Sequence, residues 1–140
     1  MRGRQSLHAH SRDPFLRGTS DGARLAADCL NDSRDRTDSL MRMAREALRD
    51  GVDQEVLAAS GRGTVRQQDR HADMADLHAG RAHALLFAAH RVSQPDKGAD
   101  WAERRARQDA ATMRQQMNAP APEGLFRRLR RSLRRRGSAS

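Results

Sequence analysis

The densest group of chemically active side chains is at the C-terminal end of the 140-residue sequence, where residues 124–140 hold seven arginines and no acid. Guanidinium groups in such a run bind polyanions, because they neutralise phosphates and release the surrounding counterions. Four large apolar residues of the segment fall on one side of a helix, which predicts a basic amphipathic helix. The arginines are Arg127, Arg128, Arg130, Arg131, Arg134, Arg135 and Arg136, and the apolar residues are Leu125, Phe126, Leu129 and Leu133.

The sequence leaves three interpretations of this tail open. The arginines contact the phosphates of DNA or RNA, or the apolar stripe enters an anionic membrane surface or a partner's hydrophobic groove. Alternatively, the stripe packs on the rest of the chain and the arginines are solvated. We favour nucleic acid, by analogy with other small arginine-tailed bacterial proteins. Phe126 alone gives no stacking platform, so the expected binding has no strong sequence preference.

Histidines form the second group of candidates, because His71, His78, His83 and His90 fall on one predicted helix. Within each of the pairs 71/78 and 83/90 the spacing is seven residues, or about 10 Å along a helix axis. That distance is too long for one ion, and no pair has the i, i+4 spacing of a helical zinc motif. The sequence therefore predicts no metal and no cofactor. A pH-sensitive interface is the functional alternative to histidines that merely border the core.

Signatures of an enzyme are missing from the sequence. The segment 61–63 reads Gly-Arg-Gly and lacks the third glycine of a dinucleotide loop and the lysine of a phosphate-binding loop. Cys29 is the single cysteine, and its alanine-rich helical context favours a small buried side chain over a nucleophile. Trp101, the single tryptophan, is expected to be a packing anchor or an interface residue. We expect a non-enzymatic protein with no catalytic residue.

The charge is strongly segregated along the chain. The total is +9, yet residues 1–12 carry +3, residues 13–123 carry −1 and residues 124–140 carry +7. A neutral body with cationic ends is expected from this pattern, and proline, glycine and apolar periodicity set its boundaries. The expected parts are a flexible basic arm at 1–19, a helical body at 20–117, a Pro/Ala linker at 118–124 and the arginine-rich tail helix at 125–140.

Composition limits the fold of the body to helices. Valine and threonine together number only eight, too few β-branched residues to furnish a sheet. The prediction is an all-α fold of three main helices, arranged as an alanine-rich bundle or an extended helical hairpin. These helices are expected at about 20–50, 64–92 and 96–117, with a short helical segment at 53–59.

Local signals set the ends of the first two helices. Ser20 is expected to cap the first helix and Gly51 to end it, with a weak polar stretch at 31–39 where the helix can break. Thr64 and Gln67 have the spacing of a capping box for the second. The apolar part of that helix, residues 81–89, is expected at the centre of the core.

Alanine buries little apolar area, so a monomeric bundle of this composition is expected to be only marginally stable. We therefore expect self-association into a homo-oligomer, or a protein partner, to supply the missing stability. The longest apolar run has six residues, Ala84–Ala89, too short for a membrane span or a signal peptide. We therefore expect a cytoplasmic accessory protein that binds nucleic acid. The alternative is a helical adaptor whose tail binds a membrane surface or a partner's groove.

Overall fold

The computed structural model describes residues 12–32 and 36–117, and all regular structure within these ranges is helical. Four α-helices follow one another: α2 (Pro14–Asp32), α3 (Arg36–Ala59), α4 (Val65–Ser93) and α5 (Gly98–Gln116). A single 3-10 turn, Pro95–Lys97, joins α4 to α5. The predicted all-α class is confirmed, but the described residues form four α-helices where three were expected.

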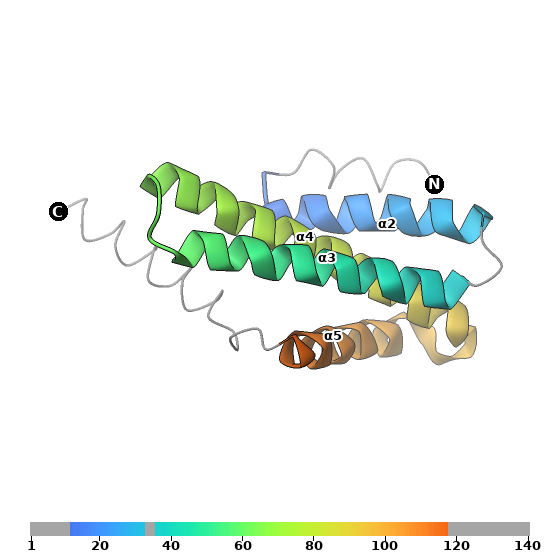
Figure 1. The fold of residues 1–140 in the computed structure, drawn as a ribbon. Helices are drawn as coiled ribbons and strands as arrows, with labels where there is room; N and C mark the ends of the chain where they lie inside the picture. The colour runs from blue at the N-terminus through green and yellow to red at the C-terminus, as the bar shows by residue number, and fades with distance from the viewer. Residues whose placement is uncertain (1–11, 33–35, 118–140) are drawn as a thin grey trace.

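The additional helix arises because the expected helix at 20–50 is interrupted in its polar stretch. The helix α2 ends at Asp32 and α3 begins at Arg36. Residues 31–39 contain hardly any apolar side chain that would reward continued packing. A break at this point costs little burial, and it lets α3 reverse direction relative to α2 (Figure 1).

The two ends predicted for this first helix are wrong. The helix begins at Pro14, which has the backbone angle and missing N–H suited to a first helical turn. Asp13 precedes it, and its carboxylate accepts a hydrogen bond of 2.9 Å from the Phe15 N–H. Ser20 therefore lies inside α2, and residues 14–19, expected in the basic arm, are helical. Gly51 lies inside α3 and is buried there, so the segment 53–59 continues α3.

The predicted capping box at the start of α4 is confirmed. The Thr64 hydroxyl accepts from the Gln67 N–H at 3.2 Å, and the Gln67 side chain accepts from the Thr64 N–H at 2.8 Å. Gly61 and Gly63, with φ angles of 68° and 83°, make the left-handed turns that bring the chain from α3 into this cap. The short, well-capped connection makes α3 and α4 an antiparallel hairpin (Figure 1).

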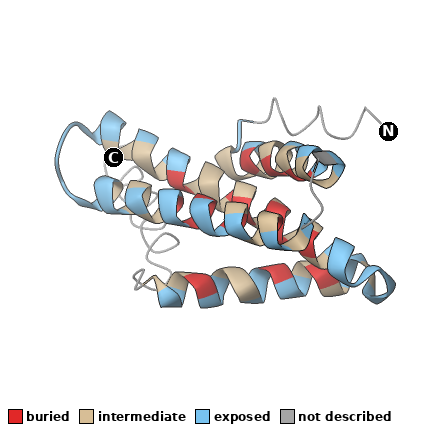
Figure 2. Ribbon diagram, turned by 45° about the vertical axis from the view of Figure 1, so that its right-hand side comes forward, coloured by how far each residue is buried: buried red, intermediate tan, exposed pale blue. Residues whose placement is uncertain are grey.

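The helix α4 is central to the described structure. It contacts α2, α3 and α5, whereas α2 and α5 contact α3 only slightly. In Figure 1 the α3–α4 hairpin lies in the middle, with α2 along one side and α5 along the other. The part of the hairpin near its turn extends beyond both flanking helices and is largely exposed (Figure 2).

Alanine dominates the core. The three largest fully buried side chains are Leu40, Leu85 and Leu86. The apolar segment 81–89 lies at the centre, as predicted, and the buried residues occupy the facing sides of the helices (Figure 2). The buried cluster comprises Ala26, Leu40, Ala44, Ala47, Leu48, Ala82, Leu85, Leu86, Ala89, Ala106 and Met113.

Glycines bring α2 and α4 into backbone contact. A Cβ added at Gly18 or Gly22 of α2 would lie closer than 3.0 Å to backbone atoms of α4, at Leu77 and Arg81 respectively. A Cβ at Gly80 of α4 would approach the Phe15 carbonyl of α2 in the same way. The two helices therefore cross where neither has a side chain, and only glycine permits this separation.

Candidate functional site

The residues expected to bind nucleic acid lie outside the described part of the chain. The arginine-rich segment 125–136 and the linker before it follow Met117, where the described residues end. The body offers other candidates: the four histidines of α4, the ion pairs between helices, and a groove between α2 and α5. None of the helices in the described ranges is both long and apolar enough to cross a membrane.

Two of the four histidines link α4 to its neighbours. The Nδ1 of His71 lies 2.8 Å from the side-chain oxygen of Gln54, which joins α4 to α3. The Nε2 of His90 lies 2.8 Å from a carboxylate oxygen of Asp109, which joins α4 to α5. Because each acceptor is an oxygen, the histidine nitrogen is the donor in both hydrogen bonds. These histidines hold helices together.

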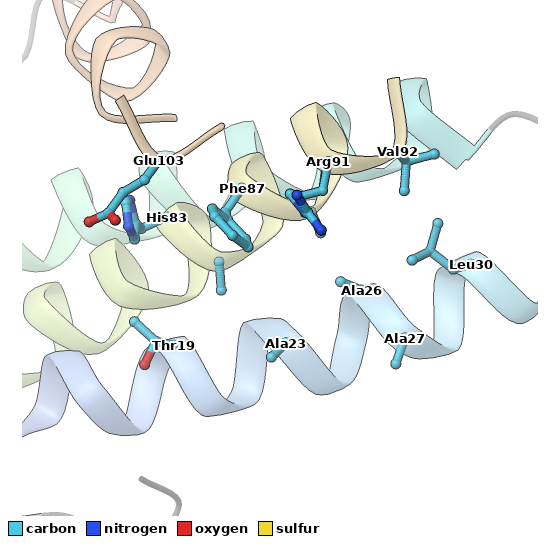
Figure 3. Close-up of a pocket in the computed structure, with 12 residues that line it drawn as sticks. Thr19, Ala23, Ala26, Ala27, Leu30, His83, Phe87, Arg91, Val92 and Glu103 are labelled. Atoms are coloured by element: carbon cyan, nitrogen blue, oxygen red, sulfur yellow. The ribbon is translucent and has the colours of Figure 1, made fainter. Parts of the chain in front are cut away.

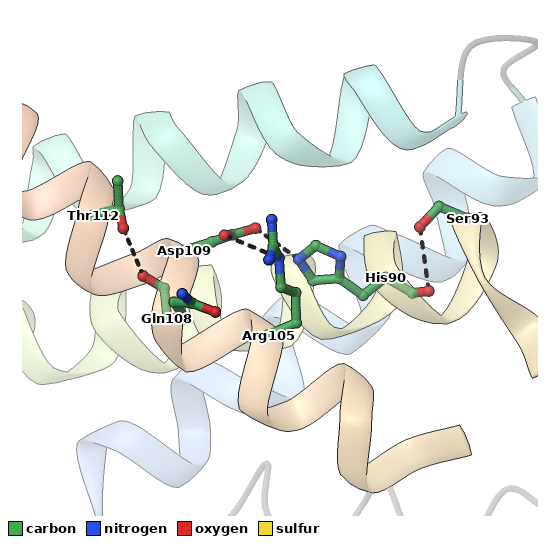
Figure 4. A network of polar contacts seen from close by, with 6 residues as sticks. All are labelled: His90, Ser93, Arg105, Gln108, Asp109 and Thr112. Atoms are coloured by element: carbon green, nitrogen blue, oxygen red, sulfur yellow. Dashed lines mark hydrogen bonds and ion pairs between the residues drawn. The ribbon is translucent and has the colours of Figure 1, made fainter. Parts of the chain in front are cut away.

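The contacts of His90 form a small polar network (Figure 4). Asp109 also pairs with Arg105 one helical turn away, at 3.5 Å. The ring of Trp101 meets the ring of His90 edge to face, with 5.7 Å between centroids. Trp101 therefore packs at the junction of α4 and α5. These contacts add to the packing of α5, whose buried residues are Ala102, Ala106 and Met113.

Metal binding gains no support from the described residues. Within residues 12–32 and 36–117, no three His, Cys, Asp or Glu side chains come together in a way that could hold a metal ion. Cys29 is a free, half-buried thiol that packs against the core.

A groove runs along α4 between α2 and α5 (Figure 3). Its volume is about 790 Å³, within the range of small-molecule sites, which runs from about 300 to 1,000 Å³. Alanines form much of its wall on α2, and Phe87 is its largest apolar side chain. The lining residues are Thr19, Ala23, Ala26, Ala27, Leu30, His83, Ala84, Phe87, Ala88, Arg91, Val92 and Glu103.

Polar groups are few in this groove. His83 and Glu103 lie next to each other at one end, and Phe87 lies between His83 and Arg91 (Figure 3). Burial lowers the pKa of His83 and is the largest effect on it. The carboxylate of Glu103 raises this pKa to a smaller extent, and the guanidinium of Arg107 lowers it further. His83 is therefore neutral at pH 7, since its ordinary pKa is already 6.5.

His78, on the side of α4 that faces α3, is the second histidine with a lowered pKa. Burial is again the main cause, and Arg81 adds to it, whereas Asp50 opposes it. The Nδ1 of His78 is buried and has no hydrogen-bond partner within the described part of the chain. In the doubly protonated ring this nitrogen would carry an N–H group with no described acceptor, and the nearby Arg81 would repel the charge, so the neutral ring is favoured.

These two histidines make the free energy of unfolding depend on pH. Because both pKa values lie below the unfolded value of about 6.5, the unfolded chain binds more protons than the folded chain as the pH falls below that value. Stability is therefore expected to decrease from about pH 6.5 downward, until the folded histidines are protonated too. Urea unfolding at pH 7.5, 6.5 and 5.5 measures this decrease.

Replacing both His78 and His83 with glutamine is expected to flatten this part of the pH profile, because the titrating groups are lost. The matched control replaces His10, which lies outside the described residues, and should leave the slope unchanged. An identical slope in the double variant and the natural chain would show that other groups cause the pH dependence.

Sequence reasoning did not find the groove. Two of its residues, His83 and Phe87, are four apart in the sequence and therefore lie on the same side of α4. Which side of α2 lies opposite them depends on the glycine contacts at residues 18, 22 and 80. That pairing is a tertiary feature, and the alanines of α2 on their own predict nothing more than a helix.

Known proteins do not extend this description: comparison of the chain with family models, with curated proteins and with solved structures gave no match.

Proposed function

We propose that this chain is a cytoplasmic, non-enzymatic accessory protein that binds DNA or RNA through the arginines of residues 127–136, largely without sequence preference. The distribution of charge carries the proposal. The described ranges hold 17 basic and 16 acidic residues, a net charge of +1, while residues 124–140 hold +7. The body therefore has almost no net charge with which to attract a polyanion, and the cationic segment provides most of the net charge of the chain.

Ion pairing within the body supports this division. Arg81 and Arg24 both pair with Asp21, at 3.7 and 3.4 Å, and Arg107 pairs with Glu103 at 2.7 Å. Arg114 of α5 pairs with Glu55 of α3. These carboxylates already interact with arginines of the body. The net excess of positive charge lies at the two ends of the chain, +3 in residues 1–12 and +7 in residues 124–140.

The body is proposed to self-associate or to bind a protein partner. Val56 and Leu57 near the end of α3 and Val65 at the start of α4 are exposed by 57%, 44% and 74%. All three lie near the turn of the hairpin, which the flanking helices do not cover (Figure 2). Exposed apolar side chains gathered at one end of a thin-cored bundle suit an interface.

A salt titration with duplex DNA and single-stranded RNA tests the role of the tail. If all seven arginines contact phosphates of duplex DNA, the logarithm of affinity should fall with the logarithm of salt concentration with a slope near −6, about −0.9 per phosphate. Replacing all seven with glutamine should remove most of this slope, because the released counterions are lost. Fluorescence anisotropy at four or five salt concentrations measures the slope.

The chain offers a control of equal charge for this experiment. Seven exposed arginines of the body can be replaced with glutamine instead, and this variant should keep most of the slope. An equal loss in the two variants would contradict the special role of the tail. Strong binding to anionic liposomes that is abolished by Leu129→Glu, together with negligible DNA binding, would favour the membrane adaptor. The control arginines are Arg17, Arg42, Arg45, Arg49, Arg62, Arg66 and Arg70.

A further inference from the structure

The groove between α2 and α5 has the form of a small-molecule site. Its floor on α4 is made by Ala84, Phe87 and Ala88, and Ala23 and Ala27 of α2 form one wall. Small side chains on the wall leave space beside Phe87, the largest apolar side chain of the floor. The stretch of α2 from Thr19 to Leu30 that lines the groove is about 16 Å long. An elongated apolar molecule could therefore lie along α4 with one side on these alanines.

The charges of the groove point to an anionic end group. Glu103 is compensated, because Arg107 pairs with its carboxylate at 2.7 Å. His83 is neutral at pH 7, as its burial requires. Arg91 makes no ion pair with any described residue, and its side chain extends from α4 toward α2 beside Phe87 (Figure 3). Among the ion pairs of the described residues, Arg91 is thus the one positive charge of the lining without a carboxylate partner, and it lies next to the apolar floor.

We infer that this groove binds an elongated apolar molecule with a single carboxylate. Arg91 pairs with the carboxylate, since a guanidinium presents two parallel N–H donors to its two oxygens. The apolar part lies over Phe87 and against Ala23 and Ala27. At the other end of the groove Glu103 is paired with Arg107 and His83 is neutral, so the described lining offers no cation to a second anionic group. The preferred class is thus a monocarboxylate, because the second carboxylate of a dicarboxylate would lose water without gaining a cationic partner.

Three probes with the same apolar chain test this inference: octanoate, octanol and octylamine. Isothermal titration calorimetry with the full chain should show the order octanoate, octanol, octylamine from tightest to weakest. The carboxylate should bind about fivefold more tightly than the alcohol, the effect of one partly exposed ion pair. Octanedioate should bind more weakly than octanoate. Amide shifts in NMR spectra should change for Ala23, Ala27 and Phe87 on addition of octanoate.

Two variants assign the binding to this groove. Arg91→Gln should make octanoate and octanol bind equally, and the control Arg104→Gln, an exposed arginine of α5, should leave the preference unchanged. Ala27→Trp fills the groove from an exposed position of α2, and it should weaken all three probes at least about tenfold. Circular dichroism must show natural helicity in each variant.

Three results would overturn the inference: no heat and no amide shifts with any probe, equal binding of the acid and the amine, or octanoate binding that survives Ala27→Trp. The inference is independent of the proposed nucleic-acid binding. The variant that lacks the seven tail arginines should bind octanoate like the natural chain, so either idea can fail without the other.

Discussion

Gly80→Ala is expected to lower the free energy of unfolding by about 3 kcal/mol or more. The added Cβ would lie closer than 3.0 Å to the Phe15 carbonyl oxygen and 3.0 Å from the Thr19 nitrogen, both backbone atoms of α2. A flexible side chain could rotate away from such a clash, but a helix backbone cannot. The variant must therefore separate α2 from α4, and burial at Ala26 would be lost with it. Urea unfolding followed by circular dichroism measures the change.

Gly51→Ala is the matched control, because it makes the same substitution inside another helix. Its Cβ would meet the Cβ of His78 at 3.3 Å and no closer atom. Alanine also gains about 1 kcal/mol of helix propensity over glycine. The two effects oppose each other, so the free energy of unfolding should stay within about 1 kcal/mol of the natural value. Equal destabilisation by the two substitutions would refute the close crossing of α2 and α4.

Leu86→Ala is expected to have the second large effect, a loss of 2–5 kcal/mol, the usual range for a fully buried leucine. Leu86 is 0% exposed and belongs to the central helix α4. The buried cluster to which it belongs is rich in alanine, and alanine side chains are too short to move in and fill the cavity. The expected loss is a large fraction of the total stability of a domain of this size, which is about 5–15 kcal/mol.

Leu57→Ala provides the comparison for this prediction, because Leu57 of α3 is 44% exposed. The same atoms are removed from a site that is already in contact with water, so a change below about 1 kcal/mol is expected. Thermal and urea unfolding of both variants measure the difference. A loss for Leu57→Ala as large as that for Leu86→Ala would mean that the exposed end of the hairpin is buried in solution, as in a self-associated body.

Much of the fold was predictable from local chemistry. The capping box of Thr64 and Gln67 depends on residues three apart. The segment 81–89 carries so many apolar side chains that only the core can bury them. Both predictions are confirmed. The class of the fold followed from the scarcity of β-branched residues, which is a property of the whole composition.

The first helix shows where local chemistry misleads. Gly51 resembles a helix end, yet α3 continues through it because Gly51 packs against α4 near His78. Ser20 resembles a cap, but Asp13 and Pro14 start the helix earlier. In both cases the sequence offered two sites for a boundary, and local preference alone could not choose between them.

The candidate sites divide in the same way. Charge is a property of the sequence, so the cationic tail was recognisable without coordinates, although its arginines lie outside the described residues. The groove depends on which sides of α2, α4 and α5 face one another. No spacing within a single helix reveals that Arg91 and Glu103 line the same space, because they come from different elements.

The central place of α4 has a consequence for how changes in the chain combine. The helices α2 and α5 both pack on α4 and make few contacts with each other. Energetic effects of substitutions in separate contact surfaces usually add, whereas effects at residues in contact are coupled. Sequence drift in α2 and in α5 can therefore proceed almost independently, while each position of α4 must satisfy several neighbours at once.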